Sequence, residues 1–248
     1  MRILIIRHAE PDYSVDSLTP KGRVEAELLS QRLARYKIRD FYVSPYGRAR
    51  DTAAYTLEKF GKKAETLPWL AEFRGRYPDR SGKWGIPWDL PPRQWSALPD
   101  QTEPDRWADD PLFDGGTVRE IWDETKAGMD ELMARYGFRK DGPVWLCNGN
   151  RDETIALFCH FGIGMAVLAY LTDVSPMTLW HRCICFPSSV TEVATEERVK
   201  GEVSFRTTKL GDLSHLEMNG EKRSTYGMYP ELYTGIDSTD PTVNGTRK

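Results

Sequence analysis

Two residues that suit phosphoryl chemistry stand side by side near the start of the chain, Arg7 and His8. Arginine is a permanent cation whose planar guanidinium matches phosphate oxygens, and a neutral imidazole is a nucleophile. The pair follows an apolar run, residues 2–6, that predicts a short buried strand. Ligands of open α/β sheets bind just beyond the carboxyl ends of strands, so the pair indicates a phosphoryl-transfer site.

Later apolar runs also predict strands with ionisable residues beyond their ends. These residues are Arg48 after the strand at 41–43, Glu72 after the strand at 63–67, and His160 after the strand at 154–159. The carboxyl ends of parallel strands can converge on one crevice. A phosphoryl group needs cationic donors, an in-line nucleophile and an acid for the leaving oxygen, and the combined set supplies all three.

Helices are predicted between these strands. Thr19 and Pro20 are typical of an N-cap and a first helical residue. The apolar stripe that follows is Val24, Leu28, Leu29, Leu33 and Tyr36. A second helix buries Ala49, Ala53, Leu57 and Phe60 and ends at Gly61. The alternation of strands and helices predicts an α/β fold, a three-layer α/β/α sandwich with a mostly parallel central sheet.

The second half of the chain continues the pattern. The motif Thr117–Glu120 predicts a capping box that opens a long helix ending at Gly137. Residues 143–147 and 154–159 flank an Asn-Gly turn signal and predict a hairpin. Further predicted elements are helices at 162–171 and 175–181 and an antiparallel pair at 190–198 and 202–208.

We expect one domain over residues 1–248, interrupted by an unusual segment. Residues 68–111 hold eight of the sixteen prolines, and five of the eight tryptophans lie between Trp69 and Trp107. Proline blocks long regular elements, and linkers are poor in aromatic residues. This composition predicts an irregular cap insertion, about residues 73–116, over the active site. A polar tail is expected from about residue 219 to residue 248.

Composition narrows the classes of protein. The net charge of −3 argues against a nucleic-acid footprint over a whole face but allows a small cationic pocket. The first apolar run is too short for a signal-peptide core or a membrane span. The cysteines are therefore expected to be reduced core thiols of a cytoplasmic protein, and His181, Cys183 and Cys185 are too crowded for a usual zinc site. No metal is expected, and no membrane partner.

The motifs together resemble the histidine phosphatase superfamily, also called the phosphoglycerate mutase-like family. The motifs that carry the resemblance are Arg7-His8-Ala9-Glu10, Leu18-Thr19-Pro20-Lys21-Gly22, the run Ser44-Pro45-Tyr46-Gly47-Arg48-Ala49-Arg50-Asp51-Thr52-Ala53, Leu70-Ala71-Glu72, and Cys159-His160-Phe161-Gly162. They stand in the family's order and extend, with the strands after them, over residues 1 to about 215.

The resemblance implies a role for each of the five residues. His8 would attack phosphorus and form a phosphohistidine, while Arg7, Arg48 and His160 would hold the phosphoryl oxygens. Glu72 would protonate the leaving oxygen and then activate water. The family implies no metal and no organic cofactor. Four departures from the family pattern fall on Ala9, Pro11, Ser14 and Phe161.

Three functions remain open at this point. The first is hydrolysis of a small phosphorylated metabolite, and the second is a mutase that returns the phosphoryl group to its substrate. Mutases of the family carry Glu-Arg-His-Tyr-Gly at the acid, whereas this chain has Glu72-Phe73-Arg74-Gly75, which favours a phosphatase. The third is a non-catalytic phosphate-binding protein, and retention of His8, Arg48 and a candidate acid argues against it. A homodimer through an edge strand or the tail stays open.

Overall fold

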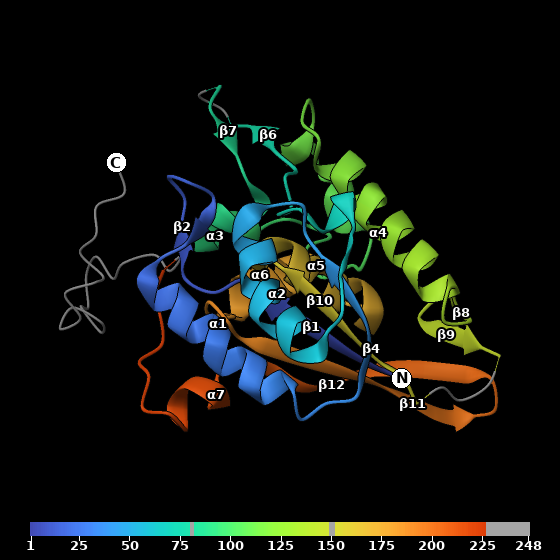
Figure 1. Cartoon of the computed structure of the whole chain (residues 1–248). Coiled ribbons are helices and arrows are strands. Elements are labelled where there is room, and N and C mark those ends of the chain that lie inside the picture. Colours follow the sequence, from blue (N-terminus) through green and yellow to red (C-terminus); the bar gives the residue numbers. More distant parts are fainter. Residues whose placement is uncertain (80–81, 149–151, 227–248) are drawn as a thin grey trace.

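The computed structural model describes residues 1–79, 82–148 and 152–226. Within these residues, eight strands form one central sheet in the order β5-β4-β10-β1-β11-β12-β9-β8. The strands are β1 (Arg2–Arg7), β4 (Ile38–Val43), β5 (Glu65–Thr66), β8 (Phe138–Asp141), β9 (Val144–Cys147), β10 (Thr154–Cys159), β11 (Val190–Val199) and β12 (Glu202–Asp212). Helices cover both faces of the sheet (Figure 1), which confirms the predicted α/β class.

The sheet is parallel on one side of β1 and antiparallel on the other. Strands β1, β10, β4 and β5 run parallel. Strands β11, β12, β9 and β8 continue the sheet in antiparallel pairs. The prediction of a mostly parallel sheet therefore holds for the half that carries the candidate site, and the whole sheet is mixed. Short turns join β11 to β12 and β8 to β9, and a short turn permits only antiparallel pairing.

The hairpin predicted from residues 143–147 and 154–159 is wrong. Strand β9 pairs with β8 and β12, whereas β10 lies between β1 and β4. Every residue of β10 is buried, as is typical of a strand in the middle of a parallel sheet. Part of the Asn-Gly turn signal lies outside the described residues. The observed hairpin joins β8 to β9 through Gly142, whose φ of 58° favours glycine.

The helices form the outer two layers. They are α1 (Pro20–Leu33), α2 (Gly47–Phe60), α3 (Pro92–Trp95), α4 (Val118–Ala134), α5 (Phe161–Thr172), α6 (Pro176–Arg182) and α7 (Ser214–Glu217). Leu4 and Ile6 of β1 pack with α1 and α2, and Ile3 and Ile5 pack with α4 and α5 on the other face. The alternation of β1 side chains between two apolar layers explains its continuous hydrophobic run.

Two details of the helix predictions needed correction. In α1, Thr19 accepts the predicted cap hydrogen bond from the Gly22 amide, but Val24 is 47% exposed and lies outside the buried face. Helix α4 begins where predicted, yet Thr117 does not cap it. The Thr117 hydroxyl instead accepts from the Arg76 amide, 3.2 Å away, because the insertion packs against the start of α4. A tertiary contact has replaced the predicted capping box.

The proline- and tryptophan-rich segment consists of short elements. They are η1 (Pro68–Leu70), β6 (Tyr77–Pro78), β7 (Trp84–Gly85), η2 (Pro87–Asp89), α3, η3 (Arg106–Asp109) and η4 (Pro111–Phe113). Trp107 is fully buried and its ring contacts Phe73, Trp122 and Trp180. Trp107 extends the main core into the insertion, because it packs against α4 and α6.

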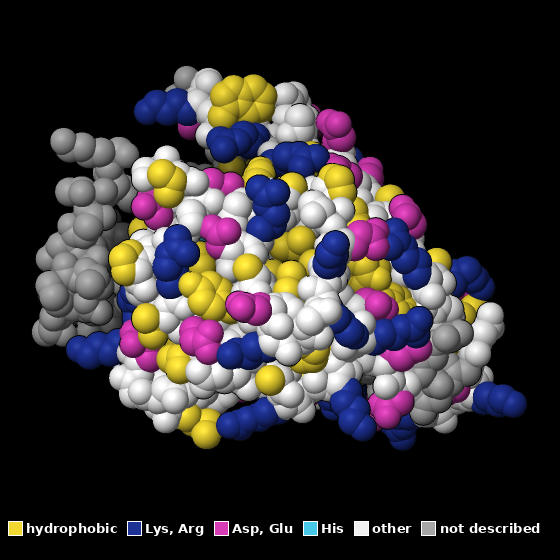
Figure 2. All heavy atoms as spheres, in the orientation of Figure 1, with side chains coloured by type: hydrophobic (Ala, Val, Ile, Leu, Met, Phe, Trp, Pro, Cys, Tyr) yellow, Lys and Arg dark blue, Asp and Glu magenta, His cyan; other side chains and the backbone are white. Residues whose placement is uncertain are grey.

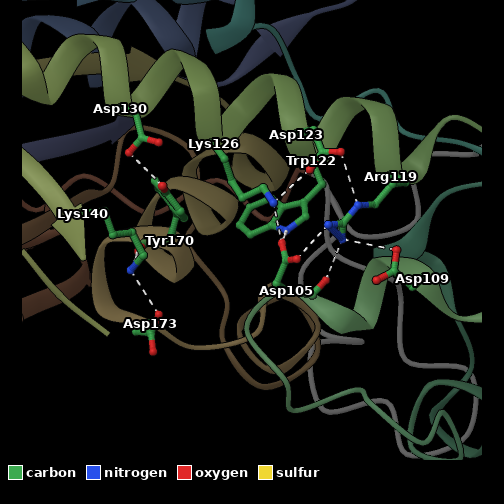
Figure 3. A network of polar contacts seen from close by, with 10 residues as sticks. All are labelled: Asp105, Asp109, Arg119, Trp122, Asp123, Lys126, Asp130, Lys140, Tyr170 and Asp173. Carbon is green, nitrogen blue, oxygen red and sulfur yellow. Dashed lines mark hydrogen bonds and ion pairs between the residues drawn. The ribbon is translucent and has the colours of Figure 1, made fainter. Parts of the chain in front are cut away.

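A polar network fastens the same segment to α4 (Figure 3). Asp105 accepts hydrogen bonds from Trp122 Nε1 at 3.0 Å and from Arg119 Nη2 at 2.7 Å, and it also pairs with Lys126. These partners lie along successive turns of α4. Asp105 thus ties the insertion to α4, in addition to the aromatic core.

The surface carries both signs of charge. On the face in Figure 2, basic and acidic side chains are interspersed. No helix within residues 1–79, 82–148 and 152–226 combines the length and apolarity of a membrane span. Cys147, Cys159 and Cys185 are buried and Cys183 is half-buried, and none of these four described cysteines forms a disulfide.

Candidate active site

The structure brings the five predicted site residues together. Arg7 ends β1 and His8 follows it, Arg48 is the second residue of α2, and His160 directly precedes α5. The His8 and His160 ring centroids are 5.1 Å apart. Both guanidinium groups act electrostatically on the two imidazoles and on the Glu72 carboxyl. The strand ends therefore converge as predicted.

His8 is held with one ring nitrogen available. It is buried, and its Nδ1 lies 2.7 Å from the carbonyl oxygen of Ala9. A carbonyl oxygen can only accept, so Nδ1 carries the hydrogen and the lone pair is on Nε2. Burial, reinforced by the Arg7 and Arg48 charges, holds the pKa of His8 well below its usual value. His8 is therefore neutral at pH 7, with Nε2 able to act as a nucleophile.

His160 is oriented by Ser44. Its Nε2 lies 2.7 Å from the Ser44 hydroxyl, and that oxygen also accepts from the Tyr46 amide at 3.3 Å. With the hydroxyl hydrogen directed to Nε2, the neutral imidazole carries its own hydrogen on Nδ1. Burial, followed by the charge interactions with His8, Arg48 and Arg7, lowers the pKa of His160 well below its usual value.

Each arginine is fixed by contacts that leave part of its guanidinium unused. Arg7 Nη1 donates to the carbonyl of Cys185 at 2.6 Å, and Nη2 donates to the carbonyl of Tyr226 at 3.4 Å. Arg48 Nη1 donates to Asp16 Oδ1 at 2.6 Å. Planar bidentate donors held in this way match the oxygens of a phosphate.

Three buried nitrogen atoms of these residues have no hydrogen-bond partner among the described residues. They are Arg7 Nε, Arg48 Nε and His160 Nδ1. Buried polar groups in folded proteins are nearly always paired, and exceptions point to a ligand, an ion or a water molecule. All three belong to residues that surround His8, and two of them are cationic. The arrangement indicates a site for an anion.

Glu72 faces the start of α5. Its Oε1 accepts from the Phe73 amide at 2.8 Å and from the Ile163 amide at 3.0 Å. Burial raises the pKa of Glu72 above its usual value, and these amides and both arginines act against the rise. Gly162 makes this approach possible, because a Cβ there would stand 2.7 Å from Glu72 Oε1 and 2.8 Å from the ring of Trp88. The insertion thus reaches the candidate acid through Trp88.

The sequence did not reveal two supporting residues. Asp16 has a φ of 48° and binds Arg48, and its Oδ2 accepts from the Gly47 amide at 2.6 Å. A Cβ on Gly47 would lie 2.0 Å from the Asp16 carbonyl, so only glycine permits the contact. Ser44 stood within a recognised motif, but no role was assigned to it. Asp16 gave no signal, because a single acid in a polar loop has no informative spacing.

Three of the residues that depart from the family pattern make defined contacts in the structure. Pro11 lies in β2 (Pro11–Asp12), which pairs with β3 (Ser17–Leu18). The Ser14 hydroxyl donates to Asp12 Oδ1 at 2.5 Å. The ring of Phe161 lies beneath the guanidinium of Arg7, 5.7 Å from centroid to Cζ. Phe161 therefore borders the anion site, whereas Ser14 is engaged within its own loop.

A loop before β11 clamps the backbone of Arg7 and His8. The Ser188 amide donates to the His8 carbonyl at 3.0 Å, and the Arg7 amide donates to the Ser189 carbonyl at 3.1 Å. Ser188 has a φ of 60°, which is strained for a residue with a side chain. Its hydroxyl lies 3.1 Å from His215 Nε2. His215 therefore supports the nucleophile's backbone through Ser188.

The protonation of His215 follows from its partners. Arg32 Nη1 lies 3.4 Å from His215 Nδ1 and 2.9 Å from Asp212 Oδ1. Arginine can only donate, so Nδ1 accepts and Nε2–H donates to Ser188. Burial, together with the Arg32 charge, lowers the pKa of His215 to about 4.

We expect this histidine to make folding sensitive to acid. The folded pKa lies below the unfolded value, so the unfolded state binds the extra proton and stability falls as pH drops from about 6.5 to 4. The His215 contribution lost between pH 7 and pH 4 is about 3 kcal/mol. In His215→Gln, which keeps a donor and an acceptor, urea unfolding at several pH values should show a shallower acid dependence. An unchanged acid dependence would refute this role.

Comparison with known proteins agrees with the geometry. The chain matches the model of the histidine phosphatase superfamily (branch 1) over residues 3–207, and it belongs to this family. A Schizosaccharomyces pombe protein described as a probable phosphatase is 26% identical in an alignment of 227 residues that covers 88% of this chain and 96% of that protein.

Solved structures share the fold. One is a mutant phosphoserine phosphatase of Entamoeba histolytica in complex with phosphoserine, with 17% identity, a TM-score of 0.57, and coverage of 87% of this chain and 98% of that one. Another is a mycobacterial glucosyl-3-phosphoglycerate phosphatase, with 20% identity, a TM-score of 0.58, and coverage of 85% and 98%.

Proposed function

We propose that the protein is a metal-independent phosphatase that hydrolyses a small phosphomonoester through a phosphohistidine on His8. The observation that carries this proposal is the ring of unpaired buried donors around a neutral histidine whose Nε2 bears a lone pair. Two cations and an imidazole N–H would hold the phosphoryl oxygens, which develop charge during transfer. The family and its phosphatase relatives support the same reaction class.

The proposed reaction has two steps. First, the Nε2 lone pair of His8 attacks phosphorus, the ester P–O bond breaks, and the Glu72 proton passes to the leaving oxygen, which gives the alcohol. Second, the Glu72 carboxylate takes a proton from water as the water oxygen attacks phosphorus, and the P–N bond breaks to release phosphate. The raised pKa of Glu72 suits the acid role, and the lowered pKa of His8 suits the nucleophile.

Phosphate release in the presence of a chelator tests this proposal. The purified chain should hydrolyse 4-nitrophenyl phosphate at the same rate with and without EDTA. It should also form no 2-phosphoglycerate from 3-phosphoglycerate. Isomer formation without phosphate release would instead identify a mutase. Binding of phosphate without turnover of any ester would identify a non-catalytic protein, and activity lost with EDTA and restored by a divalent cation would refute metal independence.

A further inference from the structure

Two exposed tyrosines form a pair beside the candidate site. Tyr13 is 52% exposed and Tyr226 is 45% exposed, although both are large aromatic residues. Their ring centroids are 5.3 Å apart and the rings are tilted by 47°. Exposed apolar patches mark ligand-binding grooves and other interaction sites, and tyrosine suits them because it offers a wide apolar face with a polar edge.

Each tyrosine is linked to one of the two site arginines. The Arg48 guanidinium carbon lies 5.1 Å from the centre of the Tyr13 ring. The Tyr226 carbonyl accepts from Arg7 Nη2, so this contact uses backbone and leaves the Tyr226 ring unengaged by Arg7. The pair therefore stands next to the anion site, although its members come from the two ends of the chain. In Figure 1 the last described residues run from α7 towards β2.

The segment that carries Tyr226 is well anchored. Ser224 is 2% exposed, and its hydroxyl accepts from the Tyr226 amide at 3.1 Å. The Arg223 guanidinium carbon lies 4.0 Å from the ring centre of Phe186. Glu221 pairs with Lys21 of α1. The contacts of Arg223 and Glu221 hold the tail against the loop before β11 and against α1, and Tyr226 follows this segment and contacts Tyr13.

Two further aromatic side chains lie beside the arginines. The Tyr46 ring lies 4.8 Å from the Arg48 guanidinium carbon and 5.2 Å from the His160 ring, and Phe161 lies beneath Arg7. A bound phosphoryl group would occupy the unpaired donors of both arginines. A substrate carboxylate would then meet aromatic rings where it needs a further cation, whereas an aromatic group would find matching faces.

We propose that Tyr13 and Tyr226 receive the leaving group of the substrate, and that this group is a planar aromatic alcohol without a carboxylate. The inference rests on the proposed phosphatase function and specifies its substrate class. Stacking between aromatic rings is favourable by an amount that corresponds to about two- to tenfold in binding.

Matched substrates test the class. Benzyl phosphate and cyclohexylmethyl phosphate have the same carbon count and both release a primary alcohol, but only the first has a planar ring. We expect kcat/KM about two- to tenfold higher for benzyl phosphate, and 3-phosphoglycerate should be poorer than both. Equal values for the two esters, or a preference for 3-phosphoglycerate, would overturn the inference.

Variants then assign the preference to the tyrosines. Tyr226→Leu keeps the backbone carbonyl that binds Arg7 but removes the ring, and Tyr226→Phe is its control because it keeps the ring. The ratio of kcat/KM for benzyl phosphate to that for cyclohexylmethyl phosphate should fall towards one in Tyr226→Leu and in Tyr13→Leu. It should persist in Tyr226→Phe and in Tyr13→Phe. A preference that survives both leucine variants refutes the assignment.

The two proposals can fail separately. If the wild-type chain hydrolyses neither ester and also fails to hydrolyse 4-nitrophenyl phosphate, the proposed function is wrong. Calorimetric titration of both esters into the same protein then decides the inference. Tighter binding of the benzyl ester that is lost in Tyr226→Leu supports it, and equal binding overturns it.

Discussion

His8→Ala is expected to reduce phosphatase activity by at least about 10⁴-fold, because it removes the nucleophile from an otherwise intact phosphate site. Arg7, Arg48 and His160 keep their own anchors on Cys185, Asp16 and Ser44. The variant should therefore still bind inorganic phosphate, as calorimetry can measure. In wild-type protein quenched during turnover, acid-labile and base-stable phosphate should map to His8.

A histidine outside the site provides the control. His181 lies in α6. Its ring stacks on the ring of Trp95 with centroids 4.8 Å apart, and its Nε2 contacts the Pro87 carbonyl oxygen. His181→Gln retains a donor for that carbonyl and should keep activity within a few-fold of wild type. Activity of His8→Ala above about one per cent, or label on another residue, would contradict the proposed mechanism.

Glu72→Gln is expected to separate the two chemical steps. An amide cannot donate a proton to an alkoxide, so hydrolysis of an alkyl phosphate should fall by about 10²- to 10⁴-fold. The 4-nitrophenolate ion leaves without protonation, so His8 should still become phosphorylated by the aryl ester. The amide cannot then activate water, and the phosphohistidine should accumulate. Stopped-flow absorbance should show a burst of one nitrophenolate per active site followed by slow turnover.

The pH profile gives a second measure of Glu72. Its acid role requires the protonated form, so wild-type kcat for an alkyl phosphate should decline as pH rises through the raised pKa of Glu72. This alkaline decline should be absent in Glu72→Gln. The lowered pKa of His8 should keep activity from falling until the pH is well below 6.5. An alkaline limb that persists in Glu72→Gln, or the absence of a burst, would assign the acid role elsewhere.

Local signals predicted the parts of the fold that local interactions determine. The starts of α1 and α6 were found because Thr19 and Ser175 cap their own helices, each followed by proline. The end of α2 was found because Gly61 adopts the left-handed conformation there. The position of β10 in the sheet was not predicted. An apolar run next to a turn signal is compatible both with a strand of a hairpin and with a central parallel strand.

The residues of the candidate site show the same contrast between local signals and long-range contacts. The five candidate residues were found because each follows a strand or opens a helix, and the order of the motifs indicated one family. The residues that orient them were missed, since Asp16, Ser188 and Tyr226 act through contacts between distant segments. Strained backbone at Asp16 and Ser188 leaves no pattern in residue type, because both residues are common in ordinary loops.

The central place of β10 has a consequence for the order of folding. Strands β1 and β4 leave the ribosome early, yet each pairs in the sheet with β10, so that Arg2 meets Thr154 and Val43 meets Phe158. Until β10 is synthesised, both strands have an unpaired edge open to other chains, and closing so long a loop slows productive pairing. His160 directly follows β10, so the docking of this one strand joins β1 to β4 and brings His160 beside His8. The rate at which activity recovers during refolding would therefore report the rate at which β10 inserts into the sheet.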